Sequence, residues 1–125
     1  MLSAELIKDT LKIDNFCYPE SFVKVMDLNL VDFDLWYFMS EDMEIKRLSG
    51  LRERYPKRGL IPFAKRDDCD DIACFEVGQG EKVQIIHDYS MEGYEQKRTY
   101  NDFWEWLKDA INEMIEYNRE EESYS

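Results

Sequence analysis

The fold prediction depends most on two apolar segments separated by a short polar stretch: Leu60-Ile61-Pro62-Phe63-Ala64, then residues 65–69, then Asp70-Asp71-Ile72-Ala73-Cys74-Phe75. Each segment has the length and apolar content of a buried strand. Pro62 has no backbone N–H to donate, so the first segment is expected at a sheet edge or at the start of a strand. The aspartates between the segments predict a turn.

Further extended segments surround this pair. Residues 72–77 and 82–87 flank the glycine-rich turn Gly78-Gln79-Gly80-Glu81, and together they predict a hairpin. Residues 94–99 predict another strand, and residues 35–39 predict one earlier in the chain, with Trp36 and Phe38 on one face. The centre of the chain is therefore expected to form a mostly antiparallel sheet.

Helices are predicted at both ends of the chain. Ser3 is a candidate cap for a first helix, and Pro19 suits the first turn of a second. Residues 41–55 have a partly helical pattern that Gly50 weakens. Thr99 with Asp102 resembles a capping box before a final helix, in which Phe103 and Trp106 begin an apolar stripe that extends to residue 117. The prediction is a single α+β domain over residues 1–118, followed by an acidic flexible tail at 119–125.

Composition limits the possible functions. The chain has 125 residues, of which 44% are hydrophobic, and a formal net charge of −12. This charge argues against binding to nucleic acid or to an anionic membrane surface, because phosphate groups would repel it. No apolar run has the length of a membrane span, and no signal peptide is apparent. We therefore expect a cytoplasmic protein, and the odd number of cysteines, three, fits reduced thiols.

The negative charge is unevenly distributed. Residues 46–66 contain eight Lys and Arg and one acid, Glu53, whereas the rest of the chain contains eight bases and 27 acids. One interpretation is that these bases neutralise acidic neighbours. The other is that the molecule has two oppositely charged surfaces that orient a charged partner.

Three patterns in the sequence are candidates for chemical sites. The aspartates Asp67, Asp68, Asp70 and Asp71 lack the glycine and the terminal glutamate of an EF-hand, so they favour a polar turn over a metal site. The cysteines lack zinc-knuckle spacing. Cys74, His87 and Asp88 are conceivable parts of a small hydrolase, but no local signature supports this. We predict no metal, no cofactor and no catalytic residues.

Several motifs resemble the SUKH superfamily over roughly residues 4–115. They are Tyr18-Pro19, the strand with Trp36, the two segments quoted above, Val83-Gln84-Ile85-Ile86-His87, and Phe103-Trp104-Glu105-Trp106-Leu107. The resemblance implies a sheet backed by helices and no enzyme activity. Many bacterial members of the superfamily are immunity proteins that bind and neutralise a cognate toxin, often a nuclease, and the resemblance implies the same role for this chain.

The functional prediction combines this resemblance with the charge. We expect an immunity protein that binds a toxin domain through Asp67, Asp68, Asp70 and Asp71, in preference to the glutamates at 120–122. The alternative is a non-enzymatic interaction scaffold that is unrelated to toxins. The predicted structural core comprises Trp36, Phe63, Cys74, Phe75, Phe103 and Trp106.

Overall fold

A computed structural model describes residues 1–123 of the chain. Its elements are, in order, α1 (Ala4–Leu11), α2 (Glu20–Asp27), β1 (Asp32–Phe33), β2 (Trp36–Phe38), α3 (Glu41–Arg54), β3 (Leu60–Arg66), β4 (Asp71–Glu76), β5 (Val83–His87), β6 (Gln96–Tyr100) and α4 (Phe103–Ser123). The six strands form one antiparallel sheet in chain order. The predicted α+β class, with helices at both ends of the chain, is therefore confirmed.

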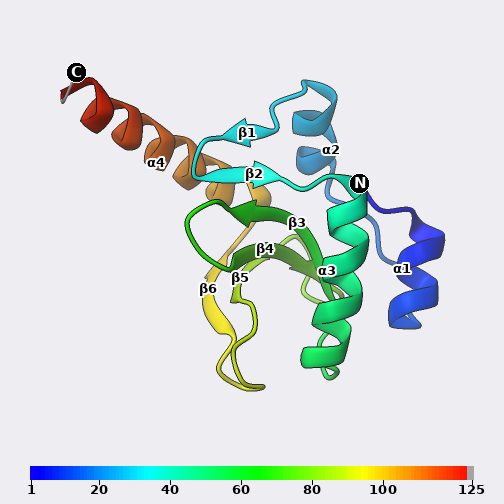
Figure 1. Ribbon diagram of the computed structural model, residues 1–125. Coiled ribbons are helices and arrows are strands. Elements are labelled where there is room, and N and C mark those ends of the chain that lie inside the picture. The colour runs from blue at the N-terminus through cyan, green and yellow to red at the C-terminus, as the bar shows by residue number, and fades with distance from the viewer. Residues whose placement is uncertain (124–125) are drawn as a thin grey trace.

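Both faces of the sheet are covered. Alternate residues of β4 face opposite sides, so Phe75 joins the larger core with α1, α2 and α4, while Cys74 joins a smaller one with Leu51 of α3. Figure 1 shows α1 beside α3, with α4 at the other end of the sheet. All six residues predicted for the core are buried: Trp36, Phe63, Cys74, Phe75, Phe103 and Trp106.

The helix starts follow local hydrogen bonding, with one correction. The Ser3 hydroxyl accepts a hydrogen bond from the Leu6 N–H at 3.1 Å, as expected for a cap. Thr99 is not the cap of the last helix, because it lies in β6 and its hydroxyl donates to Gln84 Oε1 at 2.7 Å. Asp102 has that role instead, since its Oδ1 accepts from the Glu105 N–H at 2.9 Å.

The end of α4 also differs from the prediction. The helix continues to Ser123, so residues 119–123 of the expected tail are helical, and residues 124–125 lie outside the described residues. Arginine and glutamate favour the helix even where the apolar stripe has ended, and the Ser123 hydroxyl donates to the Arg119 carbonyl at 3.0 Å. The C-terminal part of α4 projects beyond the sheet as a result (Figure 1).

Candidate protein-binding surfaces

The predicted contact residues lie in the turn that joins β3 to β4, and one of them is structural. Asp71 is buried at the start of β4, whereas Asp67, Asp68 and Asp70 are exposed. The Asp71 carboxylate lies 2.8 Å from His87 Nδ1 and accepts a hydrogen bond from Lys97 Nζ at 2.5 Å. Burial raises the pKa of Asp71, but these two contacts outweigh it and hold the pKa below its usual range. Asp71 therefore fastens the turn to β5 and β6.

Arg66 connects the same turn to α4. Its Nε donates to Asp68 Oδ1 at 2.7 Å, and its Nη1 donates to Glu113 Oε2 at 2.5 Å. The hydrogen bond from Arg66 lowers the pKa of Asp68. Within residues 1–123, Asp67 and Asp70 form no ion pair, so they are the carboxylates of this turn that remain available to a partner.

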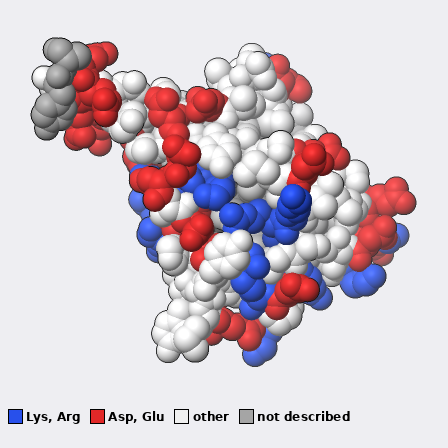
Figure 2. All heavy atoms as spheres, in the orientation of Figure 1, with Lys and Arg blue, Asp and Glu red and all other residues white. Residues whose placement is uncertain are grey.

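Further carboxylates lie on the neighbouring elements. The Asp67 N–H donates to the Leu35 carbonyl at 2.8 Å, and Asn118 Nδ2 donates to Asp34 Oδ2 at 2.6 Å, so the β1–β2 turn lies between the aspartate turn and α4. Figure 2 shows acidic side chains along the C-terminal half of α4. We call this area the acidic surface; it comprises Asp32, Asp34, Asp67, Asp70, Glu113 and Glu116.

Of this surface, only the aspartate turn is predictable as a contact site from a local pattern in the sequence. A signal for the helical part exists, because Glu113 and Glu116 are three residues apart and therefore share one face of a helix. The contribution of the β1–β2 turn has no local signal, since Asp34 reaches α4 through a contact that spans 84 residues.

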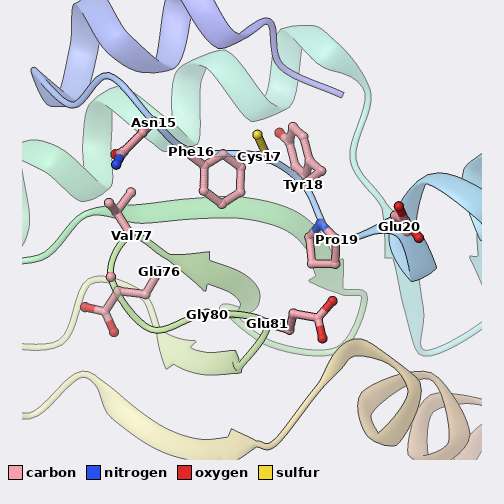
Figure 3. Close-up of a pocket in the computed structure, with 11 residues that line it drawn as sticks. Asn15, Phe16, Cys17, Tyr18, Pro19, Glu20, Glu76, Val77, Gly80 and Glu81 are labelled. Atoms are coloured by element: carbon pink, nitrogen blue, oxygen red, sulfur yellow. The ribbon is translucent and has the colours of Figure 1, made fainter.

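A groove lies at the opposite end of β4, between residues 15–20 and the β4–β5 turn. It encloses about 510 Å³, and Figure 3 shows Phe16 and Tyr18 on one wall with Glu20 and Glu81 at one end. An adjoining hollow of about 350 Å³ shares these two glutamates and extends to Trp104. The exposed thiol of Cys17 also lines the groove, but no Lys, Arg or His is among the lining residues, so no cation is placed to stabilise the reactive thiolate.

Four bases of segment 46–66 neutralise acids of the protein itself. Arg47 and Arg54 each donate to the fully buried carboxylate of Asp88 at 2.8 Å. Arg58 holds Glu76 at 2.9 Å and Glu95 at 3.0 Å, and Arg66 holds Asp68 and Glu113 as described above. For these arginines the neutralising interpretation is correct, because their partners lie within the fold.

The residues of the hydrolase alternative do not form a site. His87 pairs with Asp71 in the ladder and Cys74 pairs with Gln84, so the two side chains lie on opposite faces of the sheet. Burial also raises the pKa of the Cys74 thiol well above its usual range, which disfavours the reactive thiolate. Asp88 is occupied by Arg47 and Arg54.

Within residues 1–123, no group of three or more His, Cys, Asp or Glu side chains is arranged to hold a metal ion. None of the helices combines the length and the apolar composition that a membrane crossing requires.

Comparison with known proteins places the chain in a family. No curated protein sequence and no solved structure matches it. The profile of the SMI1 / KNR4 family (SUKH-1), however, matches residues 5–109, which include every strand and the start of α4. On this match the chain belongs to the SMI1 / KNR4 (SUKH-1) family.

Proposed function

We propose that this protein is an immunity protein that neutralises a cognate bacterial toxin, a nuclease, by binding it stoichiometrically. Membership of the SUKH-1 family is consistent with such a role. The observation that carries the proposal is the acidic surface, in which the unpaired carboxylates of Asp67 and Asp70 adjoin the carboxylates of Glu113, which pairs with Arg66, and Glu116 on a chain of net charge −12.

The charge of this surface suits the proposed target. A nuclease needs Lys and Arg side chains to hold the phosphates of its substrate. Carboxylates facing those bases would speed the encounter of the two proteins and exclude nucleic acid from the groove. In this proposal Asp67 and Asp70 contact the toxin, Asp68 acts together with Arg66, and Asp71 holds the turn in place. The protein would act in the cytoplasm, where the nucleic acid of the cell is exposed to the toxin.

The alternative is an interaction scaffold with no link to toxins. One observation favours it: the loop between β5 and β6 exposes Tyr89, Met91 and Tyr94, a second surface of different character from the acidic one. A scaffold that joins two partners would use both surfaces at once.

The proposal predicts that a reading frame adjacent to this gene ends in a nuclease toxin domain, and that domain is used for the test. The purified protein is titrated into a nuclease assay of that domain, and cells that express the domain are tested for growth with and without this protein. We expect nuclease activity to fall linearly and to end near an equimolar ratio, with growth restored. A tight complex that leaves nuclease activity intact would favour the scaffold, and the absence of both binding and protection would refute the proposal.

A further inference from the structure

Large apolar side chains are concentrated in the loop between β5 and β6, residues 88–95. Tyr89, Met91 and Tyr94 are 60%, 77% and 79% exposed. Tyrosine and methionine are enriched where proteins meet, and tyrosine is frequent among the residues that contribute most to binding. Three such side chains in one short loop therefore form a candidate contact surface.

The first end of this loop is fixed by a buried ion cluster. The Asp88 carboxylate accepts hydrogen bonds from Arg47 Nη1, Arg54 Nε and Arg54 Nη2, each at 2.8 Å. It also accepts from the Tyr89 N–H at 2.8 Å. Arg54 folds back along its own helix because Gly50 has no side chain; a Cβ there would lie 2.7 Å from Arg54 Nη2. The arginines therefore hold the loop in one position.

The backbone of Tyr89 is strained in this arrangement. Its φ is 68°, in the left-handed region that a bulky side chain seldom adopts. The guanidinium groups of Arg54 and Arg47 lie 4.3 Å and 5.3 Å from the centre of its ring, which stabilises the conformation through cation–π contacts. Strain of this kind persists only where the surroundings enforce it, and it occurs frequently at binding sites.

The second end of the loop is held as firmly. Glu95 accepts a hydrogen bond from the Gly93 N–H at 2.7 Å and one from Arg58 Nη1 at 3.0 Å. The Tyr55 hydroxyl donates to the Ser90 carbonyl at 2.8 Å. The side chains of Met91 and Tyr94 thus extend from a loop backbone that hydrogen bonds already hold in place. Binding through them therefore loses less conformational entropy than binding through a mobile loop.

We infer that this loop is the apolar anchor of the toxin contact, with Met91 and Tyr94 entering an apolar recess of the toxin. The inference rests on the proposed function. The loop adjoins the acidic surface, because the Asp88 N–H donates to the Asp70 carbonyl at 3.1 Å. Asp70, an exposed acid of that surface, therefore lies next to the first residue of the loop, and the matching recess on the toxin is one rimmed by basic side chains.

The two parts of this contact have different kinetic roles. Exposed charges act over a distance and set the rate of association. Apolar side chains that become buried act only in the formed complex and set the rate of dissociation. Changes in the loop are therefore expected to shorten the lifetime of the complex without slowing its formation.

The test compares matched double variants in biolayer interferometry against the same nuclease domain that tests the proposed function, here immobilised. Met91→Ser/Tyr94→Ser removes the anchor and leaves the Asp88 cluster intact. Leu28→Ser/Leu30→Ser is the control, because these leucines are 55% and 48% exposed and lie outside the loop. We expect dissociation about 100-fold faster for the loop variant, as for the loss of two strong contact residues, with association unchanged and the control like the parent.

The outcomes separate this inference from the proposed function. Urea midpoints of both variants, expected to equal that of the parent, exclude unfolding as the cause of faster dissociation. If the parent protein inhibits the toxin and the loop variant dissociates at the parental rate, the anchor is refuted while the proposed function remains. If the parent protein neither binds nor inhibits the toxin, both are refuted.

Discussion

The β3–β4 turn and the β5–β6 loop are adjacent connections that use acidic residues in opposite ways. They meet at the hydrogen bond between the Asp88 N–H and the Asp70 carbonyl. In the turn, Asp67 and Asp70 are exposed and have no ion-pair partner within residues 1–123. In the loop, Asp88 and Glu95 are buried, and arginines hold both of them.

This contrast shows that the net charge of a chain does not give the charge that a partner meets. A buried carboxylate needs hydrogen bonds and a cation, because its desolvation is otherwise very costly. Acids such as Asp88 therefore remove arginines from the surface and stabilise the fold. Exposed acids such as Asp70 contribute little to stability, but they contribute to the field that attracts a basic protein.

The largest expected effect on stability appears when one acid of the loop and one acid of the turn are each replaced by asparagine. Asp88→Asn keeps the shape of the side chain and leaves Arg47 and Arg54 without their counter-charge, so we expect a loss of about 3–5 kcal/mol in the free energy of unfolding. Asp70→Asn changes an exposed side chain, and we expect a change within about 0.5 kcal/mol. Urea denaturation at pH 7 measures both. Equal midpoints for the two variants would show that the Asp88 cluster does not stabilise the fold.

The sequence was sufficient for the elements whose signals are local. The hairpin around residues 78–81 and the apolar stripe from Phe103 follow from periodicity, and both are present in the structure. Thr99 was the wrong cap because its hydroxyl is engaged by Gln84 across the sheet, at a separation of 15 residues. The end of α4 was placed too early because the apolar pattern stops before the helix does.

The candidate surfaces were less predictable because they depend on contacts between residues that are far apart in the chain. The aspartate turn is a local pattern and was found. The function of Asp88 depends on Arg47 and Arg54, which lie 41 and 34 residues away in the chain. Since the residue type alone gives no information about such partners, Asp88 could equally have been an exposed acid, and the rigid display of Met91 and Tyr94 could not be foreseen.

Glu44 differs from Asp88 and Glu95 in that, within residues 1–123, it is buried without an arginine partner. Glu44 of α3 is buried, and its charged neighbour is the amino group of Met1, 3.0 Å from Oε1. Burial raises the pKa of Glu44 from 4.5 to about 7. A raised carboxyl pKa means that folding favours the protonated form, so this group lowers the stability progressively as the pH rises from 4.5 to 7, by about 3 kcal/mol in total.

Glu44→Gln removes that ionisation. We expect the variant to gain about 3 kcal/mol relative to the parent between pH 4.5 and pH 7.5, measured by urea denaturation at several pH values. Glu53→Gln, an exposed acid of the same helix, serves as the control and should follow the parent. A constant difference between Glu44→Gln and the parent over this pH range would contradict the raised pKa.

A smaller effect is expected at Asp71, the buried member of the otherwise exposed turn. Contacts with Lys97 and His87 hold its pKa below the ordinary value of 3.8. The contribution of Asp71 to the free energy of unfolding is therefore complete above pH 3.8 and is lost as the pH falls through the lowered pKa. Asp71→Asn should cost about 2 kcal/mol at pH 7, the scale of charged hydrogen bonds. The difference from the parent should narrow toward pH 2, and a difference that stays constant would count against this role.

The smallest effect is expected where charge acts only at a distance. Asp67→Asn/Asp70→Asn removes two free carboxylates of the acidic surface with little change of shape. We expect association with the toxin to slow about fivefold in 0.05 M salt and to match the parent in 1 M salt, where the Debye length is about 3 Å. Deleting residues 119–125 should slow it less, because residues 119–123 lie at the projecting end of α4, away from the strands that hold the turn. Stopped-flow measurements at both salt concentrations test this ranking. If the deletion abolishes fast association while the double variant associates like the parent, the end of α4, and not the turn, attracts the toxin.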